Sequence, residues 1–260
     1  MSDARRDQEK RLGEFREQTA GLSAAEVLRW AASTFGERLT VASSLGAEDQ
    51  VLAHMISAAN LGIPVFTLDT GRMFNESYEL MSATQRELGI KIRPYFPDAS
   101  QVEQMVAERG INLFYDSVEL RKRCCHVRKV EPLRRALAGK EAWITGLRRS
   151  QSVTRSSLGT IEWDEQNELV KISPLAEWSE DVVWEYIRAN AVPYNELHDR
   201  GFPSIGCAPC TRAVEPGADP RSGRWWWEQP EHRECGLHTA GAQESDRPAG
   251  KVEVGRLGLS

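Results

Sequence analysis

The sequence predicts an α/β protein with a mostly parallel sheet flanked by helices. Two observations carry this prediction: short β-prone runs alternate with amphipathic helical stretches from residue 39 onward, and the composition is that of a globular chain. With 260 residues, 40% of them hydrophobic, the chain is long enough for one large domain or a domain with an appendage. Disordered and fibrous classes are therefore excluded.

The predicted elements alternate along the chain. Ser23-Ala24-Ala25-Glu26 is a capping box, in which a serine oxygen and a glutamate each satisfy a free amide, and it predicts a helix through Trp30. The other predicted elements are strands at residues 39–43, 63–68, 90–96 and 141–147, helices at 47–59 and 75–88, a helix capped by Ser100, a polar-edged strand pair at 161–163 and 169–172, and a helix from Ser179.

The charge balance restricts the location of the protein and its partners. The chain has 33 basic and 38 acidic residues, a net charge of −5, which argues against general nucleic-acid binding. The sequence shows neither a secretory signal nor a membrane-spanning stretch, so it predicts a cytoplasmic protein without membrane contact. In that reducing compartment, five cysteines indicate metal ligation, redox catalysis or both rather than a disulfide framework.

Three loops that follow predicted strands carry hydroxyl groups, glycines and arginines. Their candidate binding residues are Ser43, Ser44 and Gly46 in the first loop, Leu68 in the second, and Gly146, Arg148 and Arg155 in the third. Strand C-termini meet at one edge of a parallel sheet, where helix N-termini attract anions. Taken alone, the first loop is equally compatible with an ordinary polar turn. The three loops together predict a site for an anionic nucleotide.

Four of the five cysteines form a candidate metal site. Cys124 and Cys125 are adjacent, Cys207 and Cys210 form a CxxC motif, and four thiolates can hold a structural zinc ion or an iron-sulfur cluster. Two adjacent side chains reach one zinc ion only with backbone strain, whereas a [4Fe-4S] cluster offers each a separate iron, so the cluster is favoured. Residues 121–135, with seven basic residues and one glutamate, would offset the charge of such a site. The alternative is a basic solvated helix with two inert, buried cysteines.

The fifth cysteine, Cys235, has the surroundings of a nucleophile. Gly236 and His238 follow it, and positive charge that favours thiolate over thiol comes from Arg221, Arg224 and Arg233. An incidental thiol near the C-terminus stays open as the alternative. The preceding run of three tryptophans, residues 225–227, is too apolar for a free tail and predicts that this segment docks onto the domain.

One enzyme family carries similar segments in the same order. These segments are SSLGAEDQV, LDTGRMFNESY, KRCCHVRKVEPL, WITGLRRSQSVTR, KISPLAEW, GFPSIGCAPCTRAV, GRWWWE and ECGLH. Through them the sequence closely resembles the assimilatory adenylyl-sulfate (APS) reductases over nearly its whole length. The resemblance implies a modified pyrophosphatase-loop fold, of the adenine nucleotide alpha-hydrolase kind. The related phosphoadenylyl-sulfate (PAPS) reductases share this fold and ECGLH but typically lack the cluster cysteines, so the four-cysteine pattern points to APS.

The resemblance also implies a reaction and roles for residues. Ser43, Ser44 and Gly46 would lie around phosphate, and the residues implied to address the phosphosulfate are Lys129, Arg221, Arg224 and His238. The Cys235 thiolate would attack the sulfur of APS, expel AMP and keep the sulfonate, and thioredoxin or a glutaredoxin-like reductant would then release sulfite. The resemblance implies an electrostatic and structural role for the [4Fe-4S] cluster, not electron relay.

This interpretation divides the chain into four parts. These are a charged N-terminal helix or flexible segment at residues 1–20, an α/β nucleotide-binding domain at 21–192, a C-terminal segment with CxxC and ECGLH at 193–238, and an extension at 239–260 expected to be disordered. Family members commonly end soon after ECGLH, so the extension is a departure. Other functions stay open: PAPS reduction or dual specificity, a nucleotide-binding module with a four-cysteine zinc site, and tRNA thiolation, which the acidic charge disfavours. A homo-oligomer also stays open.

Overall fold

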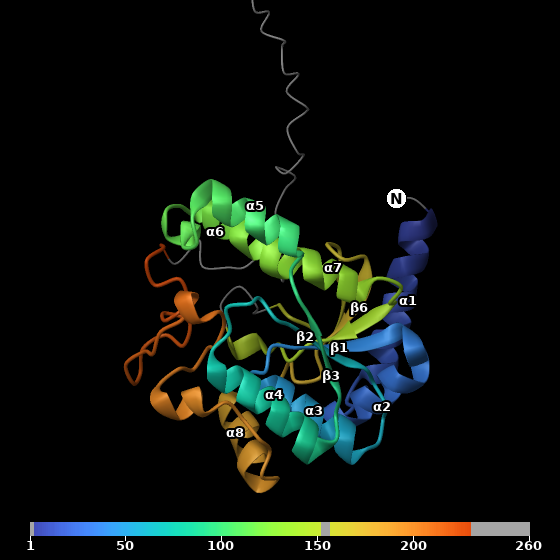
Figure 1. Ribbon diagram of the computed structural model, residues 1–260. Coiled ribbons are helices and arrows are strands. Elements are labelled where there is room, and N and C mark those ends of the chain that lie inside the picture. Colours follow the sequence, from blue (N-terminus) through green and yellow to red (C-terminus); the bar gives the residue numbers. More distant parts are fainter. Residues whose placement is uncertain (1–2, 152–156, 230–260) are drawn as a thin grey trace, which may run out of the picture.

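The computed structural model describes residues 3–151 and 157–229, which form one sheet with helices on both of its faces (Figure 1). The strands are β1 Leu39–Ser43, β2 Val65–Leu68, β3 Ile92–Tyr95, β4 Ala142–Ile144, β5 Ile161–Asp164 and β6 Leu169–Ile172. The α-helices are α1 Asp3–Thr19, α2 Ala24–Phe35, α3 Ala47–Ala58, α4 Asn75–Leu88, α5 Ala99–Arg109, α6 Val118–Cys125, α7 Glu131–Leu137 and α8 Glu180–Ala189.

The order of strands across the sheet is β3-β2-β1-β4-β6-β5. Every neighbouring pair among these strands is parallel except β5 with β6. The central strand β1 places Ser43 opposite Thr67 of β2 and Val41 opposite Ile144 of β4. The loops after β1, β2 and β4 therefore leave the sheet at the same edge. The predicted fold class, a mostly parallel sheet between helices, is confirmed.

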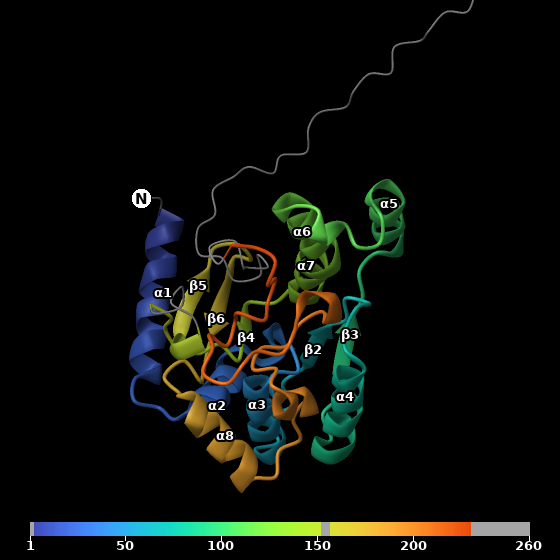
Figure 2. The ribbon, with the colours of Figure 1, turned by 90° about the vertical axis from the view of Figure 1, so that its left-hand side faces the viewer.

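Separate apolar cores lie on the two faces of the sheet. On one face α2, α3, α4 and α8 pack against the strands, and Val51 of α3 and Ile187 of α8 are fully buried there. On the other face Leu133 of α7 packs with Phe66 of β2 and Trp143 of β4. Figures 1 and 2 show α7 on the opposite side of the strands from α2 and α3. Each such buried side chain contributes about 1.5–3 kcal/mol.

The N-terminal helices support this core from the β5 side. The predicted capping box is present, because the Ser23 amide donates to the Glu26 carboxylate at 2.8 Å and the Ser23 hydroxyl accepts from the Glu26 amide at 3.4 Å. Phe15 of α1 packs edge-on against Trp30 and Phe35 of α2, with ring centroids 5.3 and 5.5 Å apart. These contacts attach α1 to α2, although the sequence of α1 is strongly charged.

Some predicted boundaries were wrong. β2, β3 and β4 are shorter than expected, and β4 ends at Ile144, so that residues 145–147 belong to the following loop, although the Thr145 amide still donates to the Ile172 carbonyl of β6 at 2.9 Å. The helix α5 is capped by Asp98, not by Ser100: the Asp98 carboxylate accepts from the Gln101 amide at 3.0 Å, and the Ser100 hydroxyl donates to the same carboxylate at 2.5 Å. Aspartate and serine are both good caps, and the backbone geometry decides between them.

The basic stretch between β3 and β4 is a continuous helical run with a defect in its middle. The helix α6 continues through a π-helical turn, His126–Val130, directly into α7. Such turns occur frequently at functional sites because they re-aim side chains. After α8 the chain forms short 3-10 helices, Glu196–Arg200 and Ala208–Cys210, and the segment from 201 to 229 passes close to α6 and the strand ends (Figure 2).

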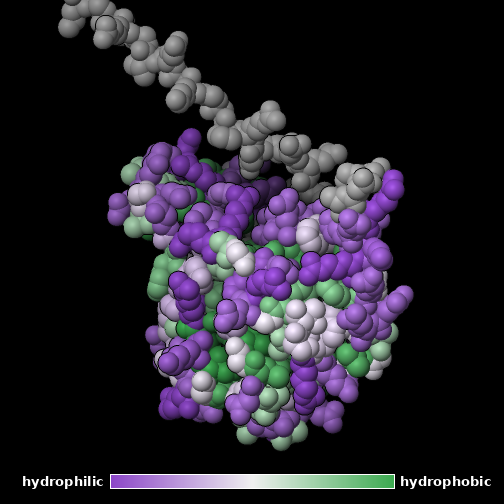
Figure 3. Space-filling model, turned by 90° about the vertical axis from the view of Figure 1, so that its right-hand side faces the viewer, coloured by the Kyte–Doolittle hydropathy of each residue, from purple (hydrophilic) through white to green (hydrophobic). Residues whose placement is uncertain are grey.

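The surface is largely polar. In Figure 3 hydrophilic side chains cover most of the face shown, with smaller apolar areas between them. Among the described residues, no helix has both the length and the apolar character that crossing a bilayer would require.

Candidate active site

A cavity of about 300 Å³ opens at the edge of the sheet where β1, β2 and β4 end. This edge is where ligands bind in open α/β sheets, because strand order reverses direction beside β1. The cavity wall includes nine of the predicted binding residues: Ser43, Ser44, Gly46, Leu68, Lys129, Gly146, Arg148, Arg221 and Arg224. The fold thus brings together residues that are up to 181 positions apart, since 224 − 43 = 181.

The first loop is held in shape by its own hydroxyl groups. The backbone amide and the hydroxyl of Ser44 both donate to the Asp49 carboxylate at 2.6 Å, and the Leu45 amide donates to the Ser43 hydroxyl at 3.1 Å. Leu45 adopts a left-handed conformation with φ of 62°, which is unfavourable for a leucine and is held here by burial. Gly46 then caps α3, so the amides at the start of α3 border the cavity.

Asp49 organises two loops, a role that the sequence analysis missed. It is buried, and burial raises the pKa of its carboxyl to about 6, although bonds from Ser44 and from the Gly146 backbone act in the opposite direction. A Cβ atom on Gly146 would overlap Asp49 Oδ1 and lie 2.9 Å from Glu48 Cβ. Glycine is therefore needed at 146 for the two loops to meet. The available signal was an acidic residue in the first turn of the helix that follows the first loop.

The third loop is fixed by an ion pair. The guanidinium of Arg148, itself only 5% exposed, binds the Glu48 carboxylate at 2.8 Å and donates to the Ser150 hydroxyl at 2.6 Å. Arg148 therefore lines the cavity while it holds the loop against the start of α3. Its predicted neighbour Arg155 lies outside the described residues.

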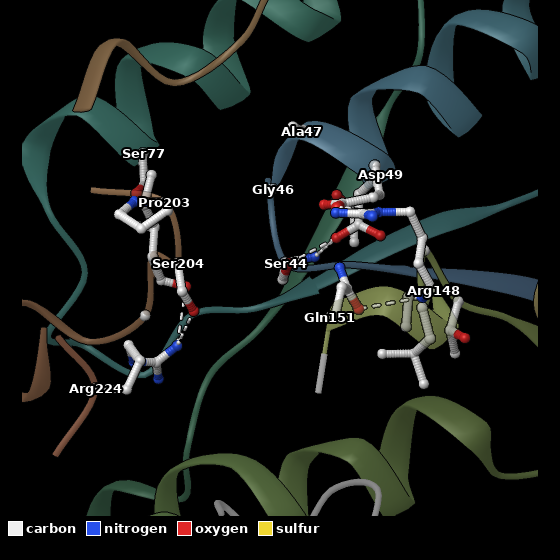
Figure 4. Close-up of a pocket in the computed structure, with 18 of the residues that line it drawn as sticks. Ser44, Gly46, Ala47, Asp49, Ser77, Arg148, Gln151, Pro203, Ser204 and Arg224 are labelled. Atoms are coloured by element: carbon white, nitrogen blue, oxygen red, sulfur yellow. Dashed lines mark hydrogen bonds and ion pairs between the residues drawn. The ribbon is translucent and has the colours of Figure 1, made fainter. Parts of the chain in front are cut away.

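Positive charge faces these loops across the cavity. Figure 4 shows Arg224 and Ser204 on one side, with Ser44 and Asp49 on the other. The Arg224 guanidinium contacts the Ser204 hydroxyl at 3.4 Å, and a Cβ atom on Gly206 would overlap it. Lys129 reaches the same cavity from the π-helical turn. An anion between these walls would meet cations on one side and helix-start amides on the other.

The four cysteines predicted as metal ligands lie in one region next to this wall. Cys124 and Cys125 end α6, Cys207 precedes the 3-10 turn Ala208–Cys210, and Cys210 ends that turn. Cys124 and Cys210 lie in one apolar cluster with Trp225, and Cys207 packs on its border. Electrostatic interactions link Cys124 with Cys207, Cys207 with Cys210, and Cys210 with Cys125. Cys207 also lines the cavity, so the cysteine group adjoins the candidate nucleotide site.

The thiols differ in their tendency to ionise. Burial raises the pKa of Cys124, and it raises that of Cys210 to about 12. Burial acts on Cys207 in the same direction, but Lys129 and nearby arginines together with a hydrogen bond to the Thr70 hydroxyl at 3.3 Å outweigh it, so its pKa is lowered. Cationic side chains therefore favour a thiolate at the point where the cysteines meet the cavity.

Part of the predicted chemistry falls beyond the described chain. Cys235 and His238, together with the extension 239–260, lie outside the described residues. In the part that is described, no three histidine, cysteine, aspartate or glutamate side chains gather closely enough to hold a single metal ion.

Comparison with known proteins identifies the family. Residues 38–213 match the phosphoadenosine phosphosulfate reductase domain. A protein of Allochromatium vinosum named adenosine 5'-phosphosulfate reductase is 54% identical over 216 residues, which cover 82% of this chain and 84% of that protein. This chain belongs to the phosphoadenosine phosphosulfate reductase family. The predicted resemblance to APS/PAPS reductases is confirmed.

Other reductases of the family agree in sequence and in fold. A Burkholderia cepacia protein named adenosine 5'-phosphosulfate reductase is 52% identical over 202 residues, covering 78% of this chain and 81% of its own. The structure of a PAPS reductase from Candida auris superposes with a TM-score of 0.68 at 31% identity, covering 82% of this chain and 98% of the other. FMN adenylyltransferase from Candida glabrata, at 16% identity and a TM-score of 0.51 over 85% of this chain and 75% of its own, shares the fold alone.

Proposed function

We propose that this reductase converts adenosine 5'-phosphosulfate to sulfite and AMP, with thioredoxin or a similar dithiol as the electron donor, in cytoplasmic sulfate assimilation and cysteine biosynthesis. One observation carries the proposal: a single cavity is shared by the strand-end loops, by Lys129 and Arg224, and by Cys207 of the cysteine group. The names of relatives that are about half identical support the choice of substrate.

We assign different parts of the nucleotide to different walls of the cavity. The start of α3 and the loop at Ser44 suit the phosphate that joins adenosine to sulfate, because amides at a helix start attract anions. To Arg224 and Lys129, which line the same cavity, we assign the stabilisation of the charge that builds up on that phosphate as its bond to sulfur breaks. Their cationic groups would stabilise the departing AMP.

The reaction runs in two thiol steps. The Cys235 thiolate attacks the sulfuryl sulfur, the bond from sulfur to the bridging oxygen breaks, and its electron pair leaves with AMP, so that Cys235 carries a sulfonate. A thioredoxin thiolate then attacks the Cys235 sulfur, and sulfite leaves with the electron pair of the sulfur-sulfur bond. The second thioredoxin thiol resolves the mixed disulfide and returns the Cys235 thiolate, so the dithiol supplies both electrons.

The residues around the cysteine group fit a [4Fe-4S] cluster. Two buried donors beside the cysteines, Arg128 Nε and Trp225 Nε1, have no acceptor among the described residues. A sulfide-rich cluster would supply acceptors for such donors. Bound there by Cys124, Cys125, Cys207 and Cys210, the cluster would contribute charge and rigidity next to the cavity.

The names of relatives support APS over PAPS as the substrate, because proteins that are 54% and 52% identical to this chain are named adenosine 5'-phosphosulfate reductase. Comparing turnover of the two nucleotides tests this preference, and faster turnover of PAPS would contradict it.

The nucleophile is tested with Cys235→Ser. Under anaerobic conditions the wild type incubated with APS alone should form a sulfonate on Cys235 and release one AMP, whereas the variant should bind AMP normally and form no adduct. Sulfite production by the variant with APS and thioredoxin would rule out Cys235 as the nucleophile.

The cluster is tested by composition. Anaerobically purified protein should contain iron and acid-labile sulfide in equal amounts, and Cys210→Ser should lower both. One zinc ion per chain without sulfide would instead support the nucleotide-binding module with a zinc site.

A further inference from the structure

The guanidinium of Arg121 lies fully buried beside one of the four cysteines. Its Nε and Nη2 atoms donate to the two carboxylate oxygens of Glu228 at 3.0 and 2.8 Å, and the Glu228 side chain is only 3% exposed. The same guanidinium forms a hydrogen bond with the sulfur of Cys125. Arg121 and Cys125 are four positions apart in α6, since 125 − 121 = 4, so their side chains lie on one face of the helix.

A second arginine has the same relation to the neighbouring cysteine. Arg128 forms a hydrogen bond with the sulfur of Cys124, again over four positions, since 128 − 124 = 4. One arginine therefore approaches the cysteine pair from the preceding turn of α6, and the other approaches it from the π-helical turn that follows. Consecutive side chains on a helix point about 100° apart, so the two sulfurs face different directions and each has its own donor.

The two arginines differ in their other contacts. Arg128 donates to the carbonyl of Thr70, which lines the cavity, so it also touches the loop after β2. Arg121 is not among the described residues that line the cavity; its guanidinium carbon lies 5.0 Å from the ring centroid of the buried Trp225. Its positive charge is balanced by Glu228 within the same buried site. Arg121 therefore acts on the cysteine group without contact with a nucleotide in the cavity.

The burial of this ion pair indicates a use beyond stability. Removing two charges from water is costly, and apolar side chains of similar size often replace a buried ion pair without loss of stability. The bidentate contact with Glu228 fixes the plane of the Arg121 guanidinium, and with it the direction of the remaining N–H groups. A sulfur that accepts from a fixed donor is held in one orientation. Hydrogen bonds to ligand sulfurs also tune iron-sulfur clusters.

We propose that Arg121 is a positioning residue for the iron-sulfur cluster: held in place by Glu228, it donates to the Cys125 sulfur, orients this sulfur as a ligand and slows the loss of iron. The inference rests on the cluster of the proposed function, with Cys125 as one of its ligands. It concerns the retention of the cluster and its bonds to sulfur, and it leaves nucleotide binding unchanged.

The test uses a double variant that refills the site without a donor. Arg121→Met with Glu228→Leu removes both charges and the hydrogen bond to the Cys125 sulfur, and apolar side chains take their place. When the anaerobic holoenzyme is mixed with an iron chelator, this variant should release iron about tenfold faster than the wild type. Its Fe–S(Cys) stretching bands in resonance Raman spectra should move to higher frequency, because a sulfur without a hydrogen bond donates more charge to iron. The Kd for AMP should stay unchanged.

The exposed ion pair of Arg123 with Glu108 provides a matched control. Arg123 belongs to the same helix and binds Glu108 at 2.7 Å, with side chains that are 38% and 42% exposed. Arg123→Met with Glu108→Leu should match the wild type in iron release and in band positions. In the folded Arg121→Met, Glu228→Leu variant, unchanged iron release would overturn the proposal. Faster release with unchanged bands would overturn it as well, because a merely structural role predicts that result.

A single substitution replaces the double variant if the latter fails to fold. Glu228→Gln leaves the Arg121 guanidinium with an unbalanced positive charge, so its hydrogen bond to the Cys125 sulfur should strengthen. The Fe–S(Cys) bands should then move to lower frequency, opposite to the shift in the double variant. Bands at or above the wild-type frequency would overturn the proposal. A wild type that holds zinc without sulfide would instead refute the cluster of the proposed function.

Discussion

Asp49 gives the sharpest stability prediction, because its carboxylate is buried between two loops of the site. Its pKa is raised from the ordinary 3.8 to about 6, with burial as the main cause. The folded protein therefore binds an extra proton between these values, so this group stabilises the fold below pH 3.8 and the contribution is lost as pH rises through 6. A shift of about 2 units at 1.36 kcal/mol per unit amounts to about 3 kcal/mol.

Asp49→Asn removes the titration while keeping the shape of the side chain. Thermal unfolding of the holoenzyme, followed by tryptophan fluorescence from about pH 4 to about pH 7, should show the wild-type midpoint falling by roughly 6–12 °C relative to the variant. Asp98→Asn is the control of opposite sign, because the Ser100 hydroxyl lowers the pKa of this exposed cap. The stability that the Asp98 carboxylate contributes is therefore lost as pH falls. Parallel pH curves for Asp49→Asn and the wild type would refute the reasoning.

Two further substitutions test the walls of the cavity. Gly206→Ala places a methyl group where the Arg224 guanidinium lies, so the affinity for AMP, measured by calorimetry, should fall about tenfold. Gly13→Ala is the control, because its methyl group meets nothing within 4 Å, and it should leave the affinity unchanged. Equal affinities in the two variants would contradict the assigned packing. Arg148→Met removes the ion pair that Arg148 forms with Glu48 at 2.8 Å, and it should lower the free energy of unfolding, measured by urea titration, by about 2 kcal/mol. A loss below about 0.5 kcal/mol would show that this ion pair does not stabilise the fold.

The sequence predicted the sheet because its elements are encoded locally. The capping box at Ser23 and the alternation of apolar runs depend on neighbouring residues, and both are present in the structure. The ends of strands are less local, since they depend on where a neighbouring strand stops. The loop at 145–147 was predicted as strand for this reason: Gly146 turns the chain toward Asp49 instead.

The site was predictable as a set of loops and cysteines but not as a network. Charged residues organise this network through contacts that are distant in the sequence. Asp49 contacts Gly146, 97 positions away, and Arg121 contacts Glu228, 107 positions away. No spacing rule relates such residues, and the sequence does not distinguish a buried aspartate or glutamate from an exposed one. The grouping of the cysteines was accessible from their spacing, and Cys124, Cys207 and Cys210 do pack at one apolar cluster. Their use as ligands of an iron-sulfur cluster stays a prediction.

One anaerobic assay, which measures sulfite and AMP together from APS and reduced thioredoxin, tests whether the chain is an APS reductase that uses Cys235. We expect equal amounts of both products, loss of both products in Cys235→Ser, and slower turnover when PAPS replaces APS. AMP released without sulfite, or sulfite formed preferentially from PAPS, would contradict it.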